Sequence, residues 1–207
     1  MSHRIALAWT RRSLLLSAAA LLTACGGIPL SAIPRLTQLS GQLLEANPAH
    51  FMVAVQADAR IVPQPGAAPQ LLIQLKPKVA GAFEPVDRKL PLTLTTSSVA
   101  TLGLDAPGTG RRWLVYSLPP ATQAELQRVQ AAVRQAQAQP GYQRGGSLSI
   151  GIEQKDLAMT DPALDHTRWS TWVQVRQSEG FFEMWNGTPA QIRKMAADAA
   201  AAQAAQR

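Results

Sequence analysis

The chain has 207 residues, of which 46% are hydrophobic, with a single cysteine and a formal net charge of +7. One cysteine excludes a disulfide within the chain, and the basic residues are scattered, with Arg111-Arg112 and Arg193-Lys194 as the densest pairs. Nucleic-acid binding usually needs a clustered basic patch, so we expect no nucleic-acid partner. The length suits one domain with a sizeable core.

Residues 1–24 have the pattern of a secretory signal peptide. Three arginines and no acidic residue precede an apolar run of 11 residues, Leu14–Ala24. A membrane-spanning helix needs about 20 apolar residues, so this run is too short for a permanent span. A basic start, a short apolar middle and small residues at the end predict a leader that is removed.

The end of this leader carries a specific motif, Leu22-Thr23-Ala24-Cys25-Gly26. It resembles the lipobox of bacterial lipoproteins. The resemblance implies that a diacylglyceryl group joins the Cys25 thiol and that signal peptidase II cuts between Ala24 and Cys25. It also implies that a fatty acid such as palmitate acylates the new amino terminus. The attachment is a thioether, so serine at position 25 would be inert.

The same resemblance implies a location in the cell. Each buried methylene contributes about 0.8 kcal/mol, so two or three acyl chains make dissociation from the membrane negligible. Gly26 stands where lipoproteins that Gram-negative bacteria retain at the inner membrane often carry aspartate. We therefore expect a lipid-anchored protein in the inner leaflet of the outer membrane, facing the periplasm. Residues 10–15 resemble the twin-arginine export pattern, but an ordinary basic signal start explains them equally well.

Processing at Cys25 takes away three arginines and leaves 17 basic and 13 acidic residues, a net charge of +4. Residues 25–34 then form the lipidated cysteine and a short tether. Its nine residues after the cysteine reach roughly 30 Å when extended. Leucines at positions 36, 39, 43 and 44 have helical spacing, although Gly41 weakens the pattern and Asn47-Pro48 ends it.

A region rich in β-strands follows. Apolar and polar residues alternate over residues 51–56, 71–76 and 90–95, as in half-buried strands. Pro91 indicates an edge position for the third of them. Four more strands are expected, at residues 112–118, 147–153, 170–177 and 180–185.

Two helices complete the pattern. Pro119-Pro120 and the capping-box sequence Thr122-x-x-Glu125 predict a helix start, and Pro140-Gly141 predicts its end. The apolar stripe of that helix consists of Leu126, Val129, Val133 and Ala136. Thr188-Pro189 begins an alanine-rich helical tail over residues 188–207, whose only large apolar anchors are Ile192 and Met195.

These elements predict a mainly β fold. We expect one small β-sandwich-like domain over residues 35–187, with about seven short strands, one inserted amphipathic helix and the C-terminal alanine-rich helix.

Few residues of the chain are candidates for catalysis or metal binding. Asp161, Asp165 and His166 lie in one loop, but their spacing matches no cation-binding pattern, and we expect no metal or cofactor. The chain has neither a Gly-x-Ser-x-Gly elbow nor a His-Glu-x-x-His motif, so catalysis has no local signature. An envelope hydrolase or metal-dependent enzyme that uses the three loop residues stays as the alternative.

The tryptophans offer a candidate contact surface. Trp169 and Trp172 are three positions apart on an extended segment, so their side chains should point to opposite faces. At least one of them should then be exposed, where it could stack on a sugar or seat a partner protein. Packing in the core is the competing interpretation.

The leading hypothesis is a non-catalytic binding or scaffold module, held at the membrane by the lipid on Cys25. Its partner could be an envelope protein, a glycan or a lipid. A further alternative is an auxiliary subunit of a transport or envelope-assembly complex.

Overall fold

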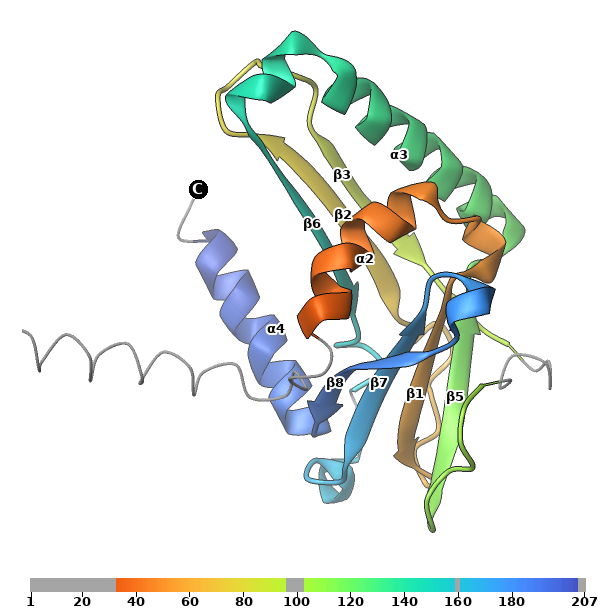
Figure 1. The fold of residues 1–207 in the computed structure, drawn as a ribbon. Helices are drawn as coiled ribbons and strands as arrows, with labels where there is room; N and C mark the ends of the chain where they lie inside the picture. The colour runs from red at the N-terminus through yellow and green to blue at the C-terminus, as the bar shows by residue number, and fades with distance from the viewer. Residues whose placement is uncertain (1–32, 96–102, 159–160, 205–207) are drawn as a thin grey trace, which may run out of the picture.

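The computed structural model describes residues 33–95, 103–158 and 161–204 (Figure 1). Over these ranges the chain forms two antiparallel sheets and three α-helices, which confirms the predicted mainly β fold. The leader, Ala24, Cys25 and the tether up to residue 32 lie outside the described residues.

The larger sheet has five strands in the order β4-β5-β1-β7-β8. Its central strand, β1, has Val53, Val55 and Ala57 fully buried on one face, because these alternate positions point into the core. The strands are β1 (Met52–Asp58), β4 (Thr93–Leu94), β5 (Arg111–Ser117), β7 (Trp169–Gln174) and β8 (Phe182–Gly187).

The smaller sheet has three strands in the order β3-β2-β6, namely β2 (Gln70–Pro77), β3 (Val86–Pro91) and β6 (Gly146–Glu153). The register places Leu71 of β2 between Leu90 of β3 and Ile152 of β6. This face joins the apolar face of the larger sheet in one continuous core.

The strand expected over residues 90–95 is divided between the two sheets. β3 ends at Pro91 in the smaller sheet, and β4 begins at Thr93 and pairs with β5 in the larger one. Leu92 between them is buried, and its N–H donates to the carbonyl of Pro69. In the described part of the chain the roughly seven predicted strands therefore become eight, and Pro91 does lie on an edge strand.

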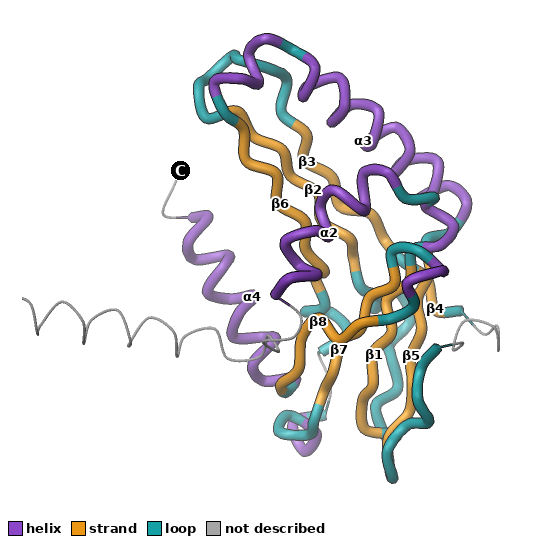
Figure 2. The backbone as a smooth tube through the Cα atoms, viewed as in Figure 1, coloured by secondary structure: helices purple, strands orange, loops and turns teal. Residues whose placement is uncertain are grey.

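Helices α2 (Ile33–Glu45) and α3 (Pro120–Ala138) pack together and on the smaller sheet. Figure 2 shows α3 running alongside β3, with α2 between α3 and β6. The predicted apolar stripe of α3 is buried. Gln130 of α3 is buried too, and its Nε2 donates to the carbonyls of Leu43 and Ala46 at 2.7 and 3.0 Å. These bonds satisfy carbonyls at the end of α2, where a helix leaves them unpaired.

The predicted capping box at Thr122 is wrong. The N-cap of α3 is Pro119, which makes no side-chain cap bond, and Thr122 is a buried residue of the first turn. Proline is favoured at the first helical position, so Pro120 starts the helix before Thr122 can cap it. Glu125 instead forms ion pairs with Arg88 of β3 and Arg128 of its own helix.

The alanine-rich tail forms α4 (Pro189–Ala204). Reciprocal capping occurs here: the Thr188 N–H donates to Gln191 Oε1 at 2.9 Å, and the Gln191 N–H donates to Thr188 Oγ1 at 3.3 Å. Ile192 is buried, but Met195 is 46% exposed, so docking is confined to the start of the helix. None of the helices in the described ranges has the length and apolar character to cross a membrane.

Candidate functional site

Trp169 cannot belong to a contact surface, and that part of the prediction is wrong. Its side chain is fully buried, because β7 lies between β1 and β8 and turns this face toward the shared core. Its indole Nε1 donates to Gln154 Oε1 at 3.1 Å, and the same oxygen accepts from Thr171 Oγ1 at 2.9 Å. A satisfied polar pair inside the core explains this tryptophan.

Trp172 points to the opposite face of the larger sheet, as the spacing predicts. It is half-buried and packs edge-on against Trp113, with ring centroids 6.0 Å apart. Trp113 Nε1 donates to the carbonyl of Asp105 at 2.8 Å. The two rings belong to a small cluster with Ala54, Val115 and Phe181, so much of their area serves packing. A contact role for Trp172 stays a prediction.

The loop residues proposed for the enzyme alternative do not converge. Asp161 accepts a hydrogen bond from the Ala163 N–H at 2.9 Å and caps the short helix Pro162–Leu164. The Asp165 carboxylate pairs with Arg193 of α4. His166 is exposed. Asp161 and Asp165 therefore have structural partners, and within the described ranges no three metal-ligating side chains come together.

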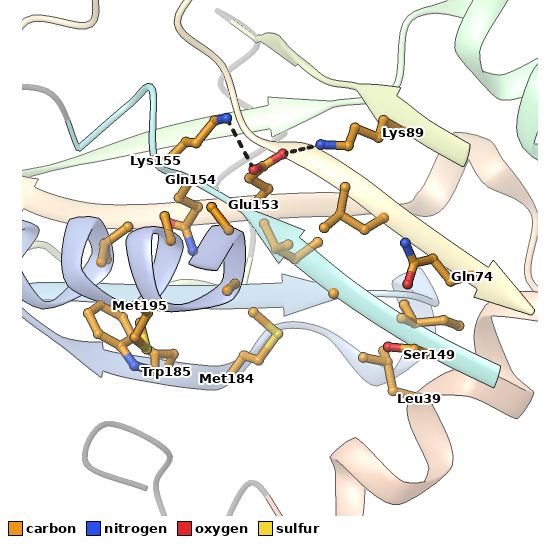
Figure 3. A pocket seen from close by; sticks show the side chains of 18 of the residues that line it. Leu39, Gln74, Lys89, Ser149, Glu153, Gln154, Lys155, Met184, Trp185 and Met195 are labelled. Atoms are coloured by element: carbon orange, nitrogen blue, oxygen red, sulfur yellow. Dashed lines mark hydrogen bonds and ion pairs between the residues drawn. The ribbon is translucent and has the colours of Figure 1, made fainter. Parts of the chain in front are cut away.

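A groove that sequence reasoning missed opens between the edge strands of the two sheets and α4 (Figure 3). Its volume is about 770 Å³, within the usual size range of ligand-binding clefts. Four walls line it: β6 from Leu148 to Glu153, Met184 and Trp185 of β8, the inner side of α4, and Leu39 of α2 with part of the outer face of the smaller sheet.

The wall formed by α4 is apolar and shallow. Ala196, Ala199 and Ala200 line the groove, so the helix borders the space without filling it. Met195 and Met184 lie at the same side (Figure 3), and unbranched methionine side chains adapt to varied shapes. This wall can therefore contact apolar groups of different shapes.

The polar wall carries no net charge. Glu153 Oε2 accepts from Lys89 Nζ at 3.1 Å, and Glu153 Oε1 lies 3.5 Å from Lys155 Nζ (Figure 3). Asp87, the second acidic residue of the groove, accepts from Gln74 Nε2 at 3.3 Å. Two cations and two carboxylates cancel, so the groove does not select an ionic ligand.

The groups with shifted pKa values lie on the larger sheet, away from the groove. Hydrogen bonds from Arg60 lower the pKa of Asp58 to about 2, and burial raises the pKa of Tyr116. Burial also lowers the pKa of Arg111, whose guanidinium donates to the carbonyl of Gln56 at 2.6 Å. Arg111 joins β5 to β1, Asp58 pairs with Arg60 two residues along the chain, and Tyr116 is packed in the core, so these shifts mark structural contacts.

Comparison of the chain with protein-family models, curated proteins and solved structures finds no match.

Proposed function

We propose that this protein is a bacterial lipoprotein that acts as a non-catalytic binding or scaffold module at the periplasmic face of the outer membrane. The observation that carries the proposal is the motif Leu22-Thr23-Ala24-Cys25-Gly26 at the end of a short, basic, apolar leader. The chain's single cysteine stands at the position that the lipid would modify.

The groove supports binding as the role of the folded part. It combines the apolar wall of α4 with a polar wall that carries no net charge, which suits the docking of an uncharged partner. Asp161 and Asp165 are engaged by the Ala163 N–H and by Arg193, and in the described ranges they form no metal-binding cluster with His166, so the geometry gives the enzyme alternative no support.

The distance to the membrane is short. α2 begins at Ile33, eight residues after Cys25, and eight extended residues span at most about 26–29 Å. A lipid on Cys25 would thus hold the groove near the bilayer surface, so we expect a partner that is itself in or close to the membrane.

The anchor is tested by expressing the full chain and its Cys25→Ser variant in a Gram-negative bacterium. The unchanged chain should be found in the membrane fraction and be released only by detergent. The variant should keep its leader and carry no lipid. Ser31→Ala, in the expected tether, is the matched control and should behave like the unchanged chain. Equal processing and equal lipid content for Cys25→Ser would contradict the proposal.

The binding role is tested in intact cells with a photoactivatable cross-linker at position 199. Ala199 lines the groove, whereas Ala197 is exposed on the same helix outside it. We expect a specific adduct from position 199 and none from position 197. Recovery of no protein, glycan or lipid from either position counts against a binding module.

A further inference from the structure

We propose that the open edge of β6 receives an extended, uncharged segment of a partner polypeptide, which adds a fourth strand to the smaller sheet alongside α4. This inference rests on the proposed binding function and names the class of partner for the groove.

β6 is an edge strand of the smaller sheet. β6 pairs with β2 along all eight of its residues, from Gly146↔Pro77 to Glu153↔Gln70, and no other described strand pairs with it. In an antiparallel strand, alternate N–H and C=O groups point away from the partner strand. The outer side of β6 therefore offers a row of donors and acceptors suited to another strand.

The other edge of the same sheet shows what protection looks like. β3 carries Asp87, Arg88 and Lys89 in its middle and Pro91 at its end, the devices that keep an edge strand from pairing further. β6 has no proline and no basic residue, and its only charge is Glu153 at the last position. The contrast within one sheet marks β6 as the edge that is left open for pairing.

The apolar side chains of β6 are incompletely buried. Leu71, Ile73 and Leu75 of β2 are fully buried. Their partners on β6, Ile152, Ile150 and Leu148, stay partly exposed although they pack against the same core. A neighbouring strand about 4.8 Å away would cover them. Because they lie at every second position, the added strand needs apolar residues at alternate positions.

The groove leaves space beside β6. Figure 3 shows β6 and α4 both bordering the groove, with Met195 on the helix side. Alanines at 196, 199 and 200 keep this side of α4 shallow, and Met195 is 46% exposed. An extended segment in this space would pair with β6 and cover Met195.

The charges of the groove favour an uncharged segment. Glu153 is held between Lys89 and Lys155, and Asp87 is bonded to Gln74, so the charges of the groove are already balanced. A charged side chain brought into the middle of the groove would lose water without gaining a partner, which is costly. The central residues of the segment are therefore uncharged.

The test uses the full chain in detergent and a synthetic peptide of four Thr-Val repeats with one lysine at each end. Amide hydrogen exchange is followed at residues 147–152. We expect alternate β6 amides to exchange at least tenfold more slowly with the peptide present. A second peptide, with proline in place of the two central valines, should have no effect because it cannot complete the ladder.

Two variants localise the effect. Ala199→Glu places a carboxylate in the groove and should weaken the peptide effect at least tenfold. Ala197→Glu, outside the groove on the same helix, should leave it unchanged. Both positions are exposed, and near-UV circular dichroism verifies that each variant keeps its fold.

Several results would overturn the proposal. One is that millimolar peptide does not slow amide exchange in β6. The others are that the proline peptide slows exchange as much as the first peptide does, or that the first peptide slows exchange in Ala199→Glu as much as in the unchanged chain. Protection without peptide that grows with protein concentration would assign the edge to a second copy. Protection without peptide that Ile28→Asp abolishes would assign it to the chain's own amino-terminal segment.

The two proposals can fail separately. If Cys25 carries lipid but β6 binds no strand, only the docking proposal fails. If β6 binds the peptide but Cys25 is unmodified, only the anchor proposal fails.

Discussion

Asp58 illustrates how the pKa of one partly buried carboxylate can be lowered by its neighbour. It accepts hydrogen bonds from Arg60 Nε at 2.9 Å, Arg60 Nη2 at 2.8 Å and the Arg60 N–H at 3.0 Å. These bonds favour the charged form and lower the pKa from 3.8 to about 2. Their stabilising effect is therefore present above about pH 4 and is lost as the pH falls through 2.

An NMR titration of Asp58 should give a midpoint near pH 2. In Arg60→Ala the midpoint should rise toward 3.8, because the side-chain bonds are lost. Identical midpoints in the two proteins would show that Arg60 does not hold this carboxylate.

Tyr116 is buried, and no described group pairs with its hydroxyl. Burying an unpaired hydroxyl costs about 1–3 kcal/mol, so Tyr116→Phe should raise the free energy of unfolding by about 1 kcal/mol. Burial also raises the pKa of Tyr116, so the folded state keeps its proton at a pH where the unfolded chain has lost it. The wild type should thus lose stability as the pH rises above 10, and Tyr116→Phe should lose less.

Chemical denaturation at pH 7 and at pH 10.5 measures both effects of this variant. If the free energy of unfolding of Tyr116→Phe at pH 7 is lower than that of the wild type by more than about 1 kcal/mol, the hydroxyl makes a favourable hydrogen bond.

Two glycines differ in what surrounds them. A Cβ at Gly141 would lie 1.9 Å from the carbonyl oxygen of Ala82, whereas a Cβ at Gly41 meets nothing within 4 Å. Gly141→Ala should cost about 1–3 kcal/mol through overpacking. Gly41→Ala, in the exposed part of α2, should stabilise by about 0.5–1 kcal/mol because alanine favours the helix. Melting curves of the two variants should move in opposite directions, and a common direction would contradict these contacts.

Among the elements, the joint between α2 and α3 depends on one buried amide. Gln130→Leu removes the donors to the carbonyls of Leu43 and Ala46 and should cost about 1–3 kcal/mol. Gln127→Leu, on the exposed side of the same helix, is the control and should change the free energy of unfolding by less than about 0.5 kcal/mol. Equal unfolding midpoints for the two variants in urea would contradict this role for Gln130.

Local patterns predict elements well, but their ends depend on neighbours. Thr122-x-x-Glu125 and Thr188-x-x-Gln191 have equivalent capping sequences, yet only Thr188 caps a helix. Pro189 follows Thr188 and starts the helix after it, whereas Pro120 precedes Thr122 and starts the helix too early. The position of proline decides between them.

The division of one strand could not be predicted, for a different reason. Leu90, Leu92 and Leu94 keep a period of two, so the pattern runs on without interruption. What changes at Leu92 is the sheet with which the chain pairs, and alternation does not report the pairing partner.

At the scale of the whole molecule, local sequence patterns do not predict how the elements pack against one another. The spacing of Trp169 and Trp172 predicts opposite faces, but only the strand order shows that Trp169 faces the core. The groove is built from α2, the smaller sheet, and the consecutive elements β8 and α4; these three parts are distant in sequence and carry no shared motif. It depends on how α4 returns past two sheet edges, which local patterns do not determine.

The anchor at Cys25 is the premise of the membrane-side role, and intact-mass spectrometry of the protein purified from native membranes tests it most directly. We predict a chain that begins at Cys25 and carries added mass corresponding to a diacylglyceryl thioether and an acylated amino terminus. A chain that retains residues 1–24, or one with an unmodified thiol at position 25, would contradict the account.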